Sequence, residues 1–354
     1  MDQSRSAISS SSKDKLYILH EYGEPGHYLG LRRLCEMRGV ELAQREFSWL
    51  RGLAKGLLFR DRKKIVRAWQ NMRFLFGLIT GPNKRVLFSA APFDWRLVFL
   101  YPILWRHRLF YHTSWSEWEG ERYPKRGVLA AVAKRLWPRM LGRCERVYAV
   151  TQRAKESLCA FGGVDPNKVE VVGHAYDETI FFPQDKKRDI DFIYAGRLVP
   201  QKGIEEVLEL FLGRSERLYV VGEGPLAPLA KEYGEQSPNI VYLPKLSKHE
   251  LASLFRRSRF VVLNSKKSPR WEELFGMVLI EAMACGAVPV AVDHVGPREV
   301  VTDGCGVLFE EGRLQEALEF ALRSDEESMR QRAIERSKEF ASSAVAQKWK
   351  GILG

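Results

Sequence analysis

Cysteine is scarce in this chain, with only five among 354 residues. The five are scattered, their number is odd and no two form a CxxC pair; they are Cys35, Cys144, Cys159, Cys285 and Cys305. Disulfide-stabilised small proteins and structural zinc sites both depend on closely spaced cysteines. We therefore expect neither a disulfide framework nor a zinc site, and we predict a reducing compartment.

Long apolar runs are also lacking. No stretch of about 18 apolar residues occurs, so no segment is expected to span a membrane. Residues 1–15 are polar and rich in serine, without the apolar core of a secretory signal. These absences predict a cytoplasmic protein, either in solution or bound peripherally at the inner face of the cytoplasmic membrane.

The whole chain has a net charge of +12, and acidic residues are few in its first half. Residues 1–183 hold 31 Lys and Arg against 18 Asp and Glu, which gives +13, and residues 184–354 hold 25 against 26, which gives −1. Positions 51–85 contain ten basic residues and one acid, Asp61. This one-sided charge predicts a large anionic partner near the first half: a membrane surface, a phosphorylated lipid or a nucleic acid.

Strand and helix signals alternate along most of the chain. Alternation at this spacing is typical of parallel sheets with helices on both faces. Apolar runs that predict strands lie at 16–20, 86–89, 109–112, 147–150 and 169–172 in the first half, and at 190–195, 218–221, 240–243, 260–263 and 288–292 in the second.

The length of the chain is too great for one ordinary core and suits two domains. A polar stretch at 183–189 is interpreted as the linker between them. We expect one domain over residues 1–183, a second over 184–325, and a C-terminal helix over 326–354 that packs back towards the first. Two doubly wound domains facing each other form a central cleft at the carboxyl ends of their strands, where such folds bind ligands.

The strongest single motif is EELFGMVLIEAMACG at residues 272–286. Gly276 stands at a junction between a loop and a helix, where backbone N–H groups and the helix N-terminus favour an anion. Glu281 lies in a helix that is apolar almost all round, so its carboxylate needs hydrogen-bond donors. Ligand hydroxyls, a structural arginine or backbone amides would each supply them.

This motif resembles the E-x7-E signature of the retaining glycosyltransferases of family 4, which have the GT-B fold with two Rossmann-like domains. Glu273 and Glu281 are its two acids, and the preceding tryptophan and glutamate resemble one branch of the family. The resemblance implies that Glu273 lies against the hydroxyls of the donor sugar and that Glu281 accepts from the ribose hydroxyls. It also implies donor contacts through the segment after the first acid, at Phe275, Gly276, Met277 and Val278.

A second segment, FIYAGRLVPQKG at 192–203, is a predicted strand, a turn and the start of a helix. Arg197 and Lys202 are five residues apart across this turn, a spacing that lets both reach one diphosphate. The family resemblance assigns them that role; otherwise they are solvated loop cations. No acidic pair of the DxD kind precedes a strand end, so we expect these cations, rather than a metal ion, to stabilise the leaving diphosphate. No cofactor is predicted.

Two shorter segments are similar to donor-binding loops of the family. YVVGEGPL at 219–226 contributes Gly222, and PKLS at 244–247 contributes Leu246 as part of a base-binding loop. Taken alone, a Gly-x-Gly-Pro turn ends a strand and starts a helix with proline in its first turn.

The first half supplies three further candidates. Gly26, in HEYGEPGH at 20–27, lies in a loop where the family has glycines facing the diphosphate, although a plain turn fits equally. His112, at the end of a predicted strand, matches a family histidine near the donor sugar and completes the predicted catalytic set of Glu273, Arg197 and Lys202, although a lone histidine at a strand end also fits a structural role. Asp94 either holds the acceptor or caps the next helix.

Residues 49–79 interleave bulky apolar side chains with cations. Interfacial amphipathic helices have this composition. Nucleic acids also bind basic and aromatic surfaces, but no nucleic-acid-binding motif accompanies this stretch, so we expect no nucleic-acid partner. The alternative to membrane contact is a core helix with one solvated basic face.

Together these features predict a retaining glycosyltransferase that moves a sugar from a nucleoside diphosphate to a hydroxyl of a lipid-linked or envelope glycan. The alternatives are an epimerase or phosphorylase on the same fold, and a degenerate transferase that acts as a membrane-docked subunit. Intact Glu273, Glu281, Arg197 and Lys202 weigh against the last of these.

Overall fold

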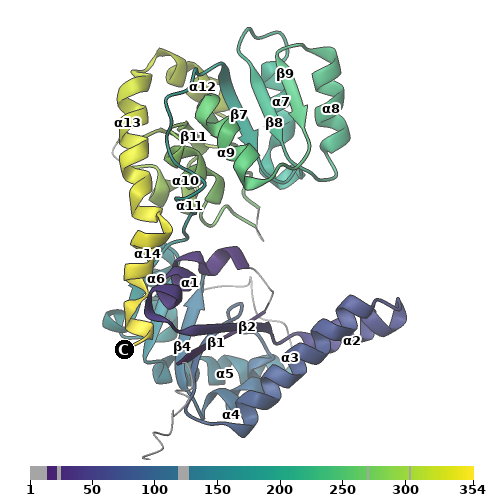
Figure 1. Ribbon diagram of the computed structural model, residues 1–354, viewed down its shortest axis with the longest axis vertical. Helices are drawn as coiled ribbons and strands as arrows, with labels where there is room; N and C mark the ends of the chain where they lie inside the picture. The colour runs from purple at the N-terminus through teal and green to yellow at the C-terminus, as the bar shows by residue number, and fades with distance from the viewer. Residues whose placement is uncertain (1–13, 22–24, 119–126, 269–270, 303) are drawn as a thin grey trace, which may run out of the picture.

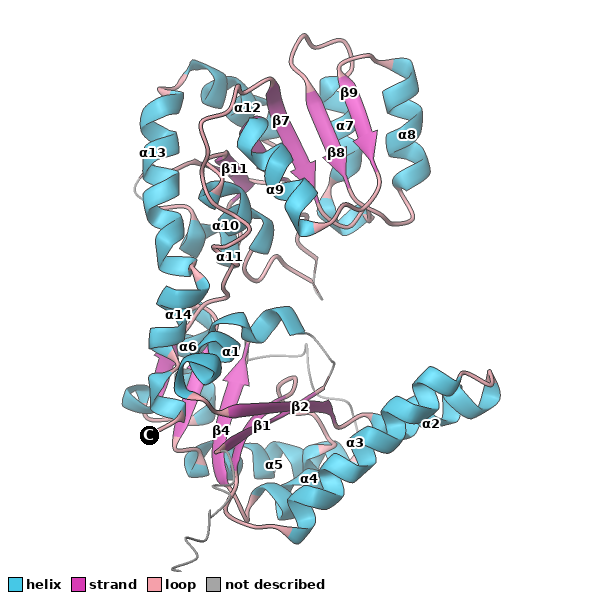
Figure 2. Ribbon diagram, in the orientation of Figure 1, coloured by secondary structure: helices cyan, strands magenta, loops and turns pink. Residues whose placement is uncertain are grey.

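The computed structural model describes residues 14–21, 25–118, 127–268, 271–302 and 304–354. The serine-rich start of the chain and the side chains of Arg51 and Lys55 lie outside this description. Two α/β domains are stacked along the long axis of the molecule (Figure 1), each built on a parallel sheet with helices on both faces (Figure 2).

The N-terminal sheet has six parallel strands in the order β2-β1-β3-β4-β5-β6. The order reverses between β1 and β3, so the loops after these two strands flank a crevice. The strands are β1 (Lys15–His20), β2 (Glu41–Glu46), β3 (Arg85–Ser89), β4 (Arg108–Thr113), β5 (Arg146–Ala149) and β6 (Val169–Val171).

Both faces of this sheet are buried, because successive side chains point to opposite sides. Val86 and Phe88 pack in one core with the helices of one face, and Leu87 packs in the other core with the helices of the opposite face. The helices and turns are η1 (Pro25–Tyr28), α1 (Leu29–Arg38), α2 (Trp49–Leu58), α3 (Arg62–Thr80), α4 (Leu97–Leu104), α5 (Val128–Arg143), α6 (Gln152–Gly162) and η2 (Pro166–Lys168).

The C-terminal sheet also has six parallel strands, in the order β12-β11-β10-β7-β8-β9. Its order reverses between β7 and β10, which pair directly. The crevice outside the carboxyl ends of these two strands is the place where such a sheet binds ligands. The strands are β7 (Ile190–Ala195), β8 (Leu218–Val221), β9 (Ile240–Leu243), β10 (Ser258–Leu263), β11 (Val288–Val292) and β12 (Val307–Phe309).

Helices cover both faces of this sheet as well. Phe192 and Val262 belong to one core and Ile193 and Val261 to the other, again by alternation along the strand. The helices and turns are η3 (Pro200–Lys202), α7 (Ile204–Phe211), α8 (Ala227–Gln236), α9 (Lys248–Arg257), α10 (Met277–Ala284), α11 (Val295–Val300) and α12 (Leu314–Arg323). The predicted fold class, two doubly wound domains of the GT-B kind, is confirmed.

The chain passes between the domains twice. The connection from β6 to β7 runs beside the segment after α13 (Glu326–Ser337) and η4 (Lys338–Phe340), where Tyr176 and Ala341 form a parallel bridge. After this crossing, α14 (Ser342–Lys348) packs on α1 of the N-terminal domain, and the chain ends with η5 (Lys350–Ile352). The C-terminal end of the chain therefore lies on the N-terminal domain (Figure 1).

A carboxylate on the C-terminal domain also contacts the N-terminal domain directly. Glu299, in α11, accepts hydrogen bonds from the backbone N–H groups of Gln152 and Arg153 at 2.7 and 3.0 Å. These amides open α6, and a helix N-terminus favours a negative charge. The contact links the two domains directly.

Helices α2 and α3 form a hairpin that projects from the N-terminal domain (Figure 1). Asp61 caps α3 by accepting from the backbone N–H of Lys64 at 3.2 Å. We call this hairpin the arm. No helix in the described ranges is both long and apolar enough to cross a membrane, the arm helices included.

Candidate active site

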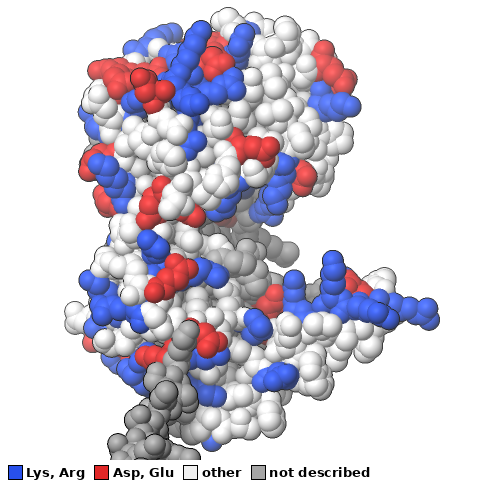
Figure 3. Space-filling model, in the orientation of Figure 1, with Lys and Arg blue, Asp and Glu red and all other residues white. Residues whose placement is uncertain are grey.

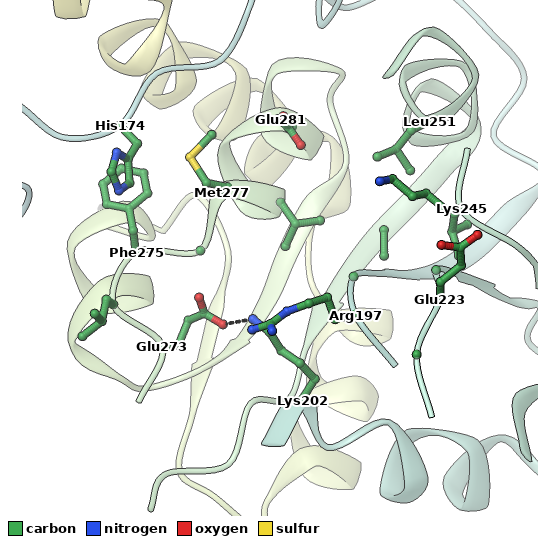
Figure 4. A pocket seen from close by; sticks show the side chains of 18 of the residues that line it. His174, Arg197, Lys202, Glu223, Lys245, Leu251, Glu273, Phe275, Met277 and Glu281 are labelled. Atoms are coloured by element: carbon green, nitrogen blue, oxygen red, sulfur yellow. Dashed lines mark hydrogen bonds and ion pairs between the residues drawn. The ribbon is translucent and has the colours of Figure 1, made fainter. Parts of the chain in front are cut away.

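A cavity of about 920 Å³ lies between the two domains at the reversal point of the C-terminal sheet (Figure 4). All residues that the sequence predicted in the second half line it: Arg197, Lys202, Gly222, Leu246, Glu273, Phe275, Gly276, Met277, Val278 and Glu281. His27, Ser114 and His174 from the preceding part of the chain also line it. The fold thus brings together side chains that are up to 84 positions apart in the C-terminal half.

Two glycines let the loops after β7 and β8 interlock. Gly222 has a φ of +155°, and a Cβ there would lie 1.8 Å from the carbonyl oxygen of Gly196. Gly224 has a φ of +154°, and its Cβ would lie 2.3 Å from the carbonyl oxygen of Leu198. Only glycine adopts this backbone conformation without strain. Gly222 therefore shapes the loop that carries Arg197, besides lining the cavity.

Lys202 and Glu273 join the two predicted motifs. The Lys202 ammonium forms an ion pair with the Glu273 carboxylate, and both side chains are largely buried (Figure 4). Ser265 donates a second hydrogen bond to Glu273 at 2.9 Å, and the Lys202 ammonium lies 5.3 Å from the centre of the Trp271 ring. The exposed Arg197 reaches into the cavity beside this pair. A cluster of two cations and one carboxylate can hold a diphosphate and the sugar attached to it.

The loop that carries Glu273 is fixed by α11. The backbone N–H of Gly296 donates to the carbonyl of Glu273 at 3.2 Å, and a Cβ on Gly296 would lie 2.2 Å from the backbone nitrogen of Phe275. Gly276 then turns the chain into α10 with a φ of +87°. The first amides of α10 border the cavity, so the helix N-terminus is available to an anion.

Glu281, in α10, is mostly buried, and its counter-charge is Lys248 rather than an arginine or a backbone amide. Oε1 of Glu281 lies 3.7 Å from the Lys248 ammonium. Burial raises the pKa of the Glu281 carboxyl, and the charge of Lys248 offsets this in part. Lys248 was missed because it is the first residue of α9, after the cap formed by Ser247 and Glu250, where a lysine reads as a solvated cation.

Glu281→Gln is expected to weaken the binding of ribonucleotides while the fold stays intact. The change keeps the side-chain volume but removes a charged acceptor for ribose hydroxyls, a contact worth about 1.5–3 kcal/mol. Calorimetry with a ribonucleoside diphosphate and its 2′-deoxy analogue measures the effect. If the mutation costs both ligands the same affinity, Glu281 does not contact the 2′-hydroxyl.

Two stacked histidines also line the cavity. The rings of His27 and His174 stack with centres 4.9 Å apart, and Phe275 meets His174 edge-on at 4.9 Å. Burial, with the nearby His27, lowers the pKa of His174 to about 3, so its ring is neutral. Neither histidine was among the site residues predicted from the sequence.

The three candidates from the first half lie outside the cavity wall. His112 is the last residue but one of β4 and is fully buried, with Tyr28 and Trp349 at ring-centre distances of 5.1 and 5.6 Å. Burial lowers the pKa of His112 well below its ordinary value. Gly26 is exposed on η1, next to the cavity residue His27. The roles of His112 and Gly26 in binding the donor stay predictions.

Asp94 lies at the reversal point of the N-terminal sheet, in the loop after β3. Its carboxylate is nearly buried and forms an ion pair with Arg96, which also pairs with Glu21 after β1. Asp94 also accepts from the backbone N–H of Arg96 at 2.9 Å, just before α4. Its predicted contact with an acceptor stays a prediction. No group of three or more His, Cys, Asp or Glu in the described residues is arranged to hold a metal ion.

Two family models match successive parts of the chain. The model described as Glycosyltransferase Family 4 matches residues 34–179, and the model described as Glycosyl transferases group 1 matches residues 176–340. The chain therefore belongs to the group 1 glycosyltransferases, as the E-x7-E motif had indicated.

Curated relatives carry the name D-inositol 3-phosphate glycosyltransferase. The protein from Mycolicibacterium paratuberculosis is 31% identical over 186 residues, which are 47% of this chain and 41% of that protein. The protein from Mycobacterium tuberculosis (strain H37Ra) is 29% identical over 210 residues, which are 52% of this chain and 42% of that protein. The matched part thus spans about two fifths of the length of these relatives.

Solved structures show the same fold over nearly the whole chain. Anabaena HepE, solved in complex with UDP and glucose, has a TM-score of 0.62 at 18% identity and covers 96% of this chain and 99% of that one. A glycosyltransferase from Rickettsia africae has a TM-score of 0.67 at 15% identity and covers 97% and 99%. At these identities the likeness establishes the fold alone.

Proposed function

We propose that the protein transfers a sugar from a nucleoside diphosphate to an acceptor hydroxyl with retention of the anomeric configuration. The observation that carries this proposal is the single cavity in which Arg197, Lys202, Glu273 and Glu281 converge. Membership of the group 1 family supports it. The complex of Anabaena HepE with UDP-glucose supports the donor class.

The charges of the cavity suggest how the donor lies. The diphosphate contacts Arg197 and Lys202, whose charges match it. The ribose hydroxyls donate to the buried carboxylate of Glu281, and the sugar lies against Glu273. Lys202 and Glu273 neutralise each other before the donor arrives, so the site holds two buried charges without leaving either unpaired.

In the proposed reaction the acceptor oxygen attacks the anomeric carbon from the face that the diphosphate leaves. The new bond joins this oxygen to the anomeric carbon, and the bond from that carbon to the diphosphate oxygen breaks. The acceptor proton passes to the departing phosphate oxygen. Arg197 and Lys202 stabilise the negative charge that develops there, and no side-chain nucleophile takes part.

Donor turnover is expected to survive EDTA, because the proposal assigns the charge of the leaving diphosphate to Arg197 and Lys202. Release of nucleoside diphosphate should proceed at the same rate with and without the chelator. A complete loss of turnover that Mg²⁺ or Mn²⁺ restores would refute the metal-independent mechanism.

For the acceptor we propose a hydroxyl of a lipid-linked or envelope glycan, at the cytoplasmic side of a membrane. The basic excess of the N-terminal half supports an anionic acceptor surface. Asp94, at the reversal point of the N-terminal sheet, is the proposed acceptor contact.

Thermal-shift measurements with UDP, GDP and ADP sugars test the donor class first. A ligand that binds only the folded protein raises its unfolding temperature. At least one of these donors should do so, and absence of any shift at millimolar donor would contradict the proposal.

A further inference from the structure

The arm exposes several large apolar side chains. In α2 and the turn after it, Leu57, Leu58 and Phe59 are 62%, 76% and 68% exposed, and in α3 Trp69 and Phe76 are 59% and 64% exposed. Single exposed apolar residues are ordinary on protein surfaces, but a contiguous set marks a site of interaction.

The residues of α3 divide into three faces. Ala68 and Leu75 are buried. Trp69 and Phe76, seven positions apart, lie on one side of this buried face, and Lys63 and Arg67 lie on the other, because 3.6 residues make one turn. The helix thus has two apolar faces. One packs against the N-terminal domain, and the other is exposed. We call the exposed apolar side of the arm the arm face.

The arm face continues onto the body of the N-terminal domain. The Arg106 guanidinium donates to the carbonyl of Ile79 at 2.5 Å, which ties the end of α3 to the segment after α4. Phe99 and Trp105, in and after α4, are themselves largely exposed. In Figure 3 most residues on the underside of the arm and of the domain beside it are uncharged, with a few Lys or Arg among them, while Lys, Arg and some acidic residues lie along the upper edge of the arm.

The charges of the arm identify its partner. Asp61 is the only acidic residue between positions 49 and 80. Within the described residues, Arg62, Lys63 and Arg73 form no ion pair, and Arg73 lies among the exposed apolar residues of α3. A second copy of this chain would bring like charges together, whereas an anionic lipid surface would neutralise them and take up the apolar side chains.

We propose that the arm face docks the protein in the plane of a bilayer that carries anionic lipids. The aromatic side chains enter the boundary between headgroups and acyl chains, and the cations contact the headgroups. The arm face is turned away from the C-terminal domain (Figure 3), so docking leaves the donor cavity open to solvent. The inference deepens the proposed function, which supplies the lipid-linked acceptor, but docking itself requires neither donor nor acceptor.

Co-sedimentation of the full chain with phosphatidylcholine vesicles, with and without a quarter of phosphatidylglycerol, tests the proposal. We expect binding to the anionic vesicles at low salt, at least 10-fold tighter than to neutral ones, and weaker as salt rises. The double variant R62E/R73E changes two cations on the same side of α3 as Trp69 and Phe76, and it should bind at least 25-fold more weakly, since each cation near an anionic surface contributes about 5-fold. W69S/F76S should lose at least 10-fold.

Matched controls lie on the other domain. F320S removes an equally exposed phenylalanine from α12, and K231E/R323E makes the same change in charge on exposed residues. These controls should bind vesicles as the wild type does. All variants should keep their unfolding temperature and their affinity for nucleoside diphosphate, which separates a failure of docking from a failure of the proposed function.

Three results would overturn the proposal. The first is a wild-type protein that does not sediment with anionic vesicles at low salt. The second is arm variants that bind as tightly as their matched controls. The third is a wild-type dimer that W69S/F76S converts to a monomer, which would make the arm face an interface between two copies.

Discussion

Gly222→Ala is expected to lower the free energy of unfolding by about 3 kcal/mol or more, among the largest effects of a single substitution. The new Cβ would lie 1.8 Å from the carbonyl oxygen of Gly196, and the φ of +155° is unfavourable for any other residue. The loops after β7 and β8 must separate to relieve the overlap. Because the first of these loops carries Arg197 and Lys202, nucleotide binding should be lost as well.

Gly196→Ala is the matched control for this variant. Gly196 lines the same cavity, yet a Cβ there meets no atom within 4 Å. Gly196→Ala should have the same midpoint of unfolding in urea as the wild type. Equal midpoints for the two variants in urea would show that the loops do not interlock as described.

Arg197→Ala and Lys202→Ala should each weaken the binding of a nucleoside diphosphate by about 10- to 150-fold. Each change removes a charge-assisted contact of about 1.5–3 kcal/mol. The nucleoside monophosphate should lose less, because it lacks the second phosphate. Lys202→Ala should also reduce kcat by about 100-fold, as removal of a group that stabilises a leaving oxygen does elsewhere.

Lys266→Ala is the control for the two cations. Lys266 follows β10 and forms an ion pair with Glu206 in α7, but it does not line the cavity. Calorimetry with the diphosphate and the monophosphate should find the affinities of the wild type. If Arg197→Ala and Lys202→Ala lose the same affinity for the monophosphate as for the diphosphate, these residues do not contact the diphosphate as proposed.

Four strands of the C-terminal domain, β7, β8, β9 and β11, were predicted to the residue, and β10 begins two residues before its predicted start. Central parallel strands are buried on both faces, so β11 appears as an uninterrupted apolar run and β7 as an apolar run broken by one charged residue, Asp191. The edge strand β2 was not predicted, because Glu41, Gln44, Arg45 and Glu46 make it look like a loop. Only its pairing with β1 makes it a strand. The three-residue β12 is too short to give a pattern.

The residues of the candidate site also fall into two groups, those that could be predicted from the sequence and those that could not. The C-terminal donor motifs are local in sequence, so their residues could be predicted one by one. The contact between Lys248 and Glu281 and the stack of His27 on His174 join distant segments, and no spacing rule predicts such pairs.

For residues 49–79 the composition left two interpretations open, a membrane-binding helix and a core helix. Both rows of apolar residues in α3 have helical spacing, so the sequence could not show which one packs on the body. The structure buries Leu75 and Leu78 and leaves Trp69 and Phe76 exposed. The distinction depends on tertiary packing.

The most direct test of the central claim measures the release of nucleoside diphosphate from UDP, GDP and ADP sugars by the purified full chain. We predict that at least one donor is turned over, slowly where water replaces the acceptor. The rate should fall by about 100-fold in Glu273→Gln, and the sugar should first appear with the anomeric configuration of the donor. Failure to turn over any of these donors, release of inorganic phosphate, or an epimerised donor as the product would contradict the account.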